Sequence, residues 1–289
     1  MKTVKTAYLK YISALLLFGL NGIVAAQIPL TSTEIVVLRS FFGTAFLIVI
    51  LAATRQKLTC LRCPRQAVLV AISGAAMGAS WLLLYRAYEL VGVSIATLLY
   101  YCGPVLVMAL SPIFFKEKLT IPKIIGIIVV FCGVIMLNGV GGGTLDALGL
   151  LCGIGGAALY VLMVITNKKA GLPGLENTAV QLLFGFLAAA VFYLLQGGSI
   201  PAVPAESWGW VLLLGLVNTG FGCWLYFSSI GTLPVQTVSV LGYLEPLSAV
   251  LFSVVLLHEG LTPARWLGAA MIVGGAMAAE FINGRKTAK

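Results

Sequence analysis

The sequence predicts an all-α membrane protein with ten transmembrane helices, arranged as two five-helix repeats of inverted topology. Three observations lead to this prediction. Of the 289 residues, 60% are hydrophobic and only 9% are charged, whereas about a quarter of the residues in a soluble domain are charged. The lysines and arginines gather in alternate connections between apolar runs, and the two halves of the chain repeat one another in a single register.

Ten apolar runs follow one another along the chain, and Pro and Gly residues mark several of the short connections between them. We expect each run to form a helix, because an open sheet cannot satisfy its backbone hydrogen bonds in lipid. The runs span residues 8–28, 33–53, 66–88, 93–114, 121–138, 148–167, 176–195, 207–229, 235–257 and 263–283.

The first run, 8–28, begins like a signal peptide. Lys2, Lys5 and Lys10 precede its apolar core, and the sequence from Val24 to Ala26 resembles a cleavage site. Because the run 148–167 is its counterpart in the second half, we expect the first run to stay in the protein as a transmembrane helix.

Positive charge predicts a multi-pass protein of the plasma (inner) membrane with both termini in the cytoplasm. In this orientation, the cytoplasmic segments hold all but three of the 18 lysines and arginines. Arg265 is the one basic residue on the outside, and Arg39 and Arg86 lie within runs. Such an excess of Lys and Arg on one side is typical of cytoplasmic loops.

Matching residues recur 142 positions apart in the two halves of the chain. We therefore predict two domains, 1–143 and 144–289, each a five-helix unit. Because five is an odd number, the units enter the membrane in opposite senses, as in many secondary transporters whose binding site lies at the repeat interface. The matching pairs include Phe42 and Phe184, Gly43 and Gly185, Tyr101 and Tyr243, Pro104 and Pro246, Glu117 and Glu259, Gly126 and Gly268, and Gly133 and Gly275.

Motifs in both halves resemble those of EamA-type members of the drug/metabolite transporter superfamily. The first half has Tyr85-Arg-Ala-Tyr, Pro104 and Phe115-Lys-Glu-Lys-Leu-Thr, and the second has Leu244-Glu245-Pro246 and His258-Glu259-Gly260-Leu261-Thr262. The resemblance covers essentially the whole chain. It implies ten helices in a 5+5 inverted repeat and the transport of small metabolites, often amino acids moving outward. The chain departs from the family at Tyr101-Cys102-Gly103-Pro104, where Thr-Pro is more usual.

Glu245 is the first candidate for a substrate-binding residue. It lies nine residues into an apolar run, roughly 14 Å deep and thus near the middle of a ~30 Å hydrocarbon core. A carboxyl group at this depth is costly unless it faces protein or water, and Pro246 loosens the helix beside it. We expect Glu245 either to bind a substrate ammonium group and take up a proton, or to tie two helices together.

Other polar and aromatic residues within the runs are further candidates. Arg39 either pairs with Glu245, holds a substrate carboxylate, or extends toward the outer surface. Asn21, Gln181 and Asn218 either contact substrate or bond between helices. Aromatic residues either line a cavity that suits an amine or belong to the interfacial belt. The aromatic candidates are Trp81, Tyr85, Tyr88, Tyr100, Tyr101, Trp224 and Tyr243.

These features favour a secondary active transporter working by alternating access, most simply an exporter or exchanger of an amino acid or small amine, with proton coupling through Glu245. The alternatives are an intramembrane enzyme or a membrane channel or scaffold. Asp146 is the only aspartate and His258 the only histidine, so the usual hydrolase groups are missing. The partners expected are a small-molecule substrate and membrane lipid, with no nucleic acid and no cofactor. The pair Cys60 and Cys63 lacks the second pair or histidine of a zinc site, so we predict no metal.

Overall fold

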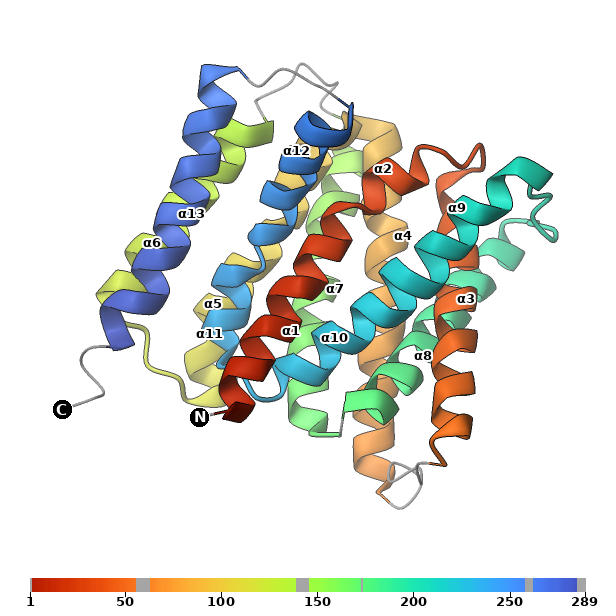
Figure 1. Ribbon diagram of the computed structural model, residues 1–289, viewed down its shortest axis with the longest axis horizontal. Helices are drawn as coiled ribbons and strands as arrows, with labels where there is room; N and C mark the ends of the chain where they lie inside the picture. Colours follow the sequence, from red (N-terminus) through yellow and green to blue (C-terminus); the bar gives the residue numbers. More distant parts are fainter. Residues whose placement is uncertain (1, 56–62, 139–145, 173, 258–261, 285–289) are drawn as a thin grey trace.

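The computed structural model describes residues 2–55, 63–138, 146–172, 174–257 and 262–284, and the regular structure within these ranges is entirely helical (Figure 1). The sequence motifs at Cys60 and from His258 to Leu261 lie outside the described residues. The elements are α1 Lys2–Gly19, α2 Asn21–Ala25, α3 Ser32–Ala53, α4 Pro64–Tyr100, α5 Cys102–Phe115, α6 Ile121–Asn138, α7 Ala147–Ala170, α8 Gly174–Leu195, η2 Ala205–Ser207, α9 Trp208–Leu212, the π-helix η3 Leu213–Phe221, α10 Gly222–Ile230, α11 Val235–Leu241, α12 Leu244–Leu257 and α13 Pro263–Gly284.

The described helices have the composition of a membrane bundle, which confirms the predicted all-α membrane protein. Seven helical stretches of these residues are long and apolar enough to cross a membrane, and Cys102–Phe115, Ile121–Met136 and Trp266–Gly275 form shorter apolar helices. Large apolar side chains such as Val49 and Leu195 are 66% and 82% exposed. Apolar surface of this extent is expected where helices face lipid.

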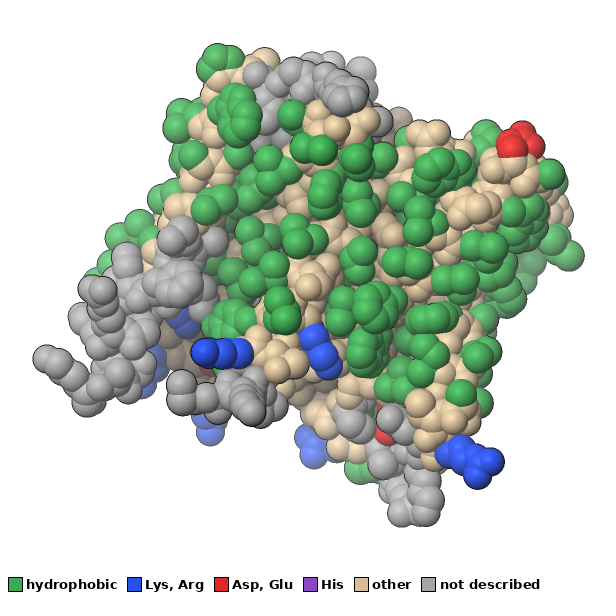
Figure 2. Space-filling view, in the orientation of Figure 1, with side chains coloured by type: hydrophobic (Ala, Val, Ile, Leu, Met, Phe, Trp, Pro, Cys, Tyr) green, Lys and Arg blue, Asp and Glu red, His purple; other side chains and the backbone are tan. Residues whose placement is uncertain are grey.

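The two ends of the bundle differ in charge. In Figure 2, Lys and Arg side chains line the lower edge of the molecule, and hydrophobic side chains cover much of the face above them. In Figure 1, α1 begins and α13 ends at this same edge. We refer to it below as the lysine-rich end.

The helix α4 differs from the sequence prediction of two separate runs, 66–88 and 93–114. Its helical assignment continues to Tyr100, and α5 follows at Cys102. However, the Ser80 hydroxyl donates to the Tyr100 hydroxyl at 3.3 Å. Twenty residues of straight helix would separate these positions by about 30 Å. The chain therefore reverses its direction within α4, so two antiparallel segments are present as the sequence predicts.

Two helices are interrupted next to their prolines. The break between α11 and α12 falls at Gly242 and Tyr243, directly before Glu245 and Pro246. The break between α4 and α5 falls at Tyr101, shortly before Pro104. The predicted helix break beside Glu245 is thus confirmed. Interrupted helices free backbone groups that can line a binding site.

Candidate functional site

Glu245 lies in the first turn of α12 and is half-buried. Its carboxylate lies within electrostatic range of the hydroxyl groups of five tyrosines, which come from α1, α4, the α4–α5 break, α7 and α10. Two of these tyrosines, Tyr11 and Tyr226, are buried, so the carboxylate lies near groups of the bundle interior. The five tyrosines are Tyr11, Tyr100, Tyr101, Tyr160 and Tyr226.

Together with Tyr243, these five residues form a continuous chain of rings, which we call the tyrosine cluster. The ring centroids of Tyr243 and Tyr101 are 5.9 Å apart, and those of Tyr101 and Tyr100 are 6.2 Å apart. Tyr100 lies 5.9 Å from Tyr160. The hydroxyls of Tyr160 and Tyr226 are 3.3 Å apart, and the rings of Tyr226 and Tyr11 are 5.2 Å apart. The cluster thus joins both helix breaks to three other helices.

Hydrogen bonds fix part of the cluster. The Tyr243 hydroxyl donates to the carbonyl oxygen of Tyr101 at 2.6 Å, so the two helix breaks are tied to each other. The Tyr11 hydroxyl donates to the carbonyl oxygen of Val238 at 2.8 Å. Tyr11 and Tyr243 are fully buried, whereas Tyr100, Tyr101 and Tyr160 are half-buried. The half-buried rings therefore keep surface that a ligand can contact.

Arg39 lies near this cluster but has partners of its own. Its Nε donates to the Thr219 hydroxyl at 3.0 Å, and its guanidinium lies 4.6 Å from the centre of the Trp81 ring. Thr219 belongs to the π-helix η3, a type of segment that is frequent at functional sites. Arg39 lies within electrostatic range of Glu245, but within the described residues the two side chains form no ion pair within 4 Å.

The remaining candidates are placed in several separate contacts. The Asn218 amide donates to the Asn21 carbonyl oxygen at 3.1 Å, which links η3 to α2. Tyr85 packs against Tyr88, with ring centroids 5.5 Å apart. Trp224 is half-buried and lies under the ammonium group of Lys10, at 4.8 Å from the ring centre.

Gln181 belongs to a buried amide network between α7 and α8. Its carbonyl oxygen accepts from the Asn167 amide at 2.8 Å, and Asn167 and Asn177 exchange two hydrogen bonds of 3.0 Å. Such contacts between helices fit the structural alternative for Gln181.

Sequence reasoning missed three members of the tyrosine cluster: Tyr11, Tyr160 and Tyr226. Each lies within an apolar run, as Tyr101 does, so the presence of a tyrosine inside a run was an available signal. The sequence pattern did not predict that α1, α7 and α10 bring these tyrosines together.

No set of three or more His, Cys, Asp or Glu side chains within the described ranges is arranged to hold a metal ion. Cys63 is exposed, and its sequence partner Cys60 lies outside those ranges. The chemistry available at the candidate site is therefore that of one carboxylate, one guanidinium and a set of aromatic rings.

Comparison with known proteins gives one family and a group of transporters. The sequence model of the EamA-like transporter family matches residues 5–139 and, a second time, residues 147–279. The chain is 27% identical over 281 residues to the uncharacterized transporter YxxF of Bacillus subtilis (strain 168), which covers 95% of this chain and 89% of that protein. It is 25% identical over 215 residues to protein RarD of Streptomyces exfoliatus, covering 73% of this chain and 67% of that protein.

A solved structure described only as "Crystal structure of protein" has the same fold. It covers 98% of both chains with a TM-score of 0.84 and 21% sequence identity. At this identity the likeness concerns the arrangement of helices alone.

Proposed function

The chain belongs to the EamA-like transporter family, and from this premise we propose that it is a secondary active transporter working by alternating access. Its membership makes it a multi-pass membrane transporter of small molecules and not an enzyme. The proposed cargo is an amino acid or small amine, which the protein exports or exchanges.

The observation that carries this proposal is the half-buried Glu245 carboxylate beside the tyrosine cluster. A carboxylate and the faces of aromatic rings both attract an ammonium group. Arg39 can hold a carboxylate, because its guanidinium donates paired hydrogen bonds. Since Arg39 and Glu245 form no ion pair among the described residues, both charges remain for the two ends of a zwitterion. Trp81, under Arg39, and the half-buried Tyr101 would complete the binding surface.

We further propose ten transmembrane helices in two inverted repeats, 1–143 and 144–289. The family model matches each half once, which supports this division. Contacts at matching positions support it as well. A Cβ atom on Gly133 would meet the Gly268 carbonyl oxygen at 2.7 Å, and one on Gly275 would meet the Gly126 carbonyl oxygen at 2.8 Å. Tyr101 and Tyr243, which also match, bond to each other.

The proposed location is the plasma (inner) membrane, with the lysine-rich end in the cytoplasm. The start of α1 and the end of α13 both lie at that end (Figure 1), and cytoplasmic loops are enriched in Lys and Arg. Both termini are then cytoplasmic.

The proposed energy source is a proton gradient, because the sequence contains no ATP-binding motif. Removal from water favours the neutral form of a carboxylic acid. A proton and an ammonium group would thus compete for Glu245, which couples the movement of one to the opposite movement of the other.

Uptake into proteoliposomes tests the role of Glu245. Cargo is first chosen by thermal unfolding of the purified protein with amino acids and polyamines, because a bound ligand raises the melting temperature. Glu245→Gln should then lower saturable uptake by at least about tenfold and remove its pH dependence, since it deletes the charge and the titrating group. The control is Glu206→Gln, the same change at an exposed carboxylate. Unchanged uptake and pH dependence in Glu245→Gln would exclude the proposed role.

A further inference from the structure

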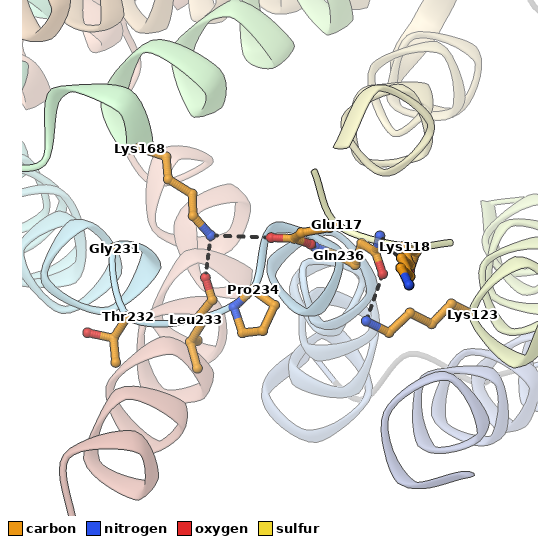
Figure 3. A pocket seen from close by; sticks show the side chains of 9 residues that line it. All are labelled: Glu117, Lys118, Lys123, Lys168, Gly231, Thr232, Leu233, Pro234 and Gln236. Carbon is orange, nitrogen blue, oxygen red and sulfur yellow. Dashed lines mark hydrogen bonds and ion pairs between the residues drawn. The ribbon is translucent and has the colours of Figure 1, made fainter. Parts of the chain in front are cut away.

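A second polar site lies at the lysine-rich end, apart from the tyrosine cluster. A pocket of about 430 Å³ opens there between α6, the end of α7 and the segments that follow α5 and α10 (Figure 3). This volume lies within the range of small-molecule sites. The charged residues of its lining are Glu117, Lys118, Lys123 and Lys168.

The single carboxylate of the pocket is already engaged. One oxygen of Glu117 accepts from the backbone N–H of Val235 at 2.8 Å, and the other accepts from that of Gln236 at 3.2 Å. The Lys168 ammonium group lies 3.7 Å from Glu117 and donates to the Leu233 carbonyl oxygen at 2.6 Å. Glu117 and Lys168 therefore form part of the pocket wall, and their opposite charges largely compensate each other.

The other two lysines keep unused donors. Lys123 donates to the Gln236 side-chain oxygen at 2.7 Å, and an ammonium group has three N–H donors. Lys118 is exposed, and its ammonium group has no hydrogen bond or ion pair within the described part of the chain. Three lysines against one carboxylate give the lining two positive charges without a counter-charge.

We propose that this pocket binds a phosphate group. A phosphate monoester carries a charge of about −1.5 to −2 at neutral pH and three acceptor oxygens, which matches the two uncompensated charges and the free donors of Lys118 and Lys123. The group belongs either to an anionic lipid of the adjoining leaflet, since basic pockets between helices on the cytoplasmic side bind lipid head groups, or to a phosphate-bearing solute in water, since lysines bind phosphate as point charges. The site is distinct from the one proposed for cargo, which combines one positive charge, Arg39, with one negative charge, Glu245.

Thermal unfolding of the purified full-length protein tests the proposal in two arms. One arm titrates inorganic phosphate at constant ionic strength, and the other compares vesicles of phosphatidylcholine with vesicles that also contain phosphatidic acid. We expect a concentration-dependent rise of the melting temperature in one or both arms. A rise with phosphate indicates that a free solute suffices, and a rise with phosphatidic acid alone indicates a lipid headgroup.

Three variants make the result specific to the pocket. Lys118→Gln/Lys123→Gln should raise the ligand concentration for half the shift at least about tenfold, because it removes charge-assisted hydrogen bonds. Lys118→Gln alone changes an exposed side chain whose ammonium group bonds to no other described residue. It should therefore weaken ligand binding while the protein still folds. Lys169→Gln is the matched control, because this exposed neighbour of Lys168 packs on Phe114 outside the pocket. No shift in either arm, or equal shifts in all variants, overturns the proposal.

Discussion

Two opposite charges, the buried Arg39 and the half-buried Glu245, form no ion pair with each other among the described residues. A charge away from water is costly unless other groups compensate it. For Arg39 these groups are the Thr219 hydroxyl and the Trp81 ring. Both contacts depend on the planar guanidinium, which can stack on a ring and donate from its edge at once.

Arg39→Lys is therefore not a conservative change. The ammonium group keeps the charge but cannot reproduce stacking and the Nε bond together, so we expect transport efficiency to fall at least about tenfold. Initial uptake rates in proteoliposomes measure the effect. Arg86→Lys is the matched control, because Arg86 forms an exposed ion pair with Glu89. Wild-type transport by Arg39→Lys would show that charge alone is required at this position.

At the scale of elements, small residues set the distance between helix backbones. A Cβ atom on Gly78 of α4 would clash with the carbonyl oxygen of Gly185 in α8. At the matching positions, Gly220 of η3 lies against Gly43 of α3. Glycines at such crossings let helix backbones approach closely.

Gly78→Ala should consequently destabilise the bundle. The added methyl group meets backbone, which cannot move aside as a flexible side chain would, and overpacking of this kind costs about 1–3 kcal/mol. A lower melting temperature in detergent measures the loss. In Gly274→Ala, by contrast, the new methyl group has no atom within 4 Å, so its melting temperature should stay close to that of the wild type. Equal melting temperatures for the two variants would contradict the packing argument.

Features determined by local sequence were predictable at this scale. The break before Glu245 follows from Gly242 and Pro246, and the position of Glu245 in the apolar helix α12 follows from its place in an apolar run. The π-helix η3 was not predictable, because it depends on tertiary contacts. Within it, the Thr219 hydroxyl donates to the carbonyl oxygen five residues earlier, at Leu214, and accepts from Arg39 of α3.

The membership of the tyrosine cluster was only partly predictable for a similar reason. Tyr101 and Tyr243 could be paired from the internal repeat. Tyr11, Tyr160 and Tyr226 have no tyrosine at the matching position, so the repeat gives no sign of them. Their meeting follows from the packing of three helices that are distant in the chain.

On the scale of the whole molecule, the lysine-rich end joins the two proposed halves through side chains. Glu117, which follows α5, holds two backbone N–H groups at the start of α11. The side-chain amide of Gln236 in α11 donates a hydrogen bond to the Ser111 hydroxyl of α5 at 2.9 Å. If access alternates as proposed, these bonds must break whenever this end opens. They therefore contribute to the free-energy difference between its closed and open states.

Glu117→Gln should shift that balance toward opening. The side-chain amide of the new glutamine has one acceptor oxygen for the two backbone N–H groups, and it carries no charge to pair with Lys168. About one charge-assisted hydrogen bond is therefore lost. We expect the amide hydrogens of Val235 and Gln236 to exchange roughly tenfold faster or more, because exchange reports the free energy of local opening. Hydrogen–deuterium exchange with mass spectrometry of the peptide covering the α10–α11 connection measures this. Glu89→Gln, at an exposed carboxylate of α4, should leave these amides unchanged. Equal exchange in Glu117→Gln and the wild type would mean that other contacts keep this end closed.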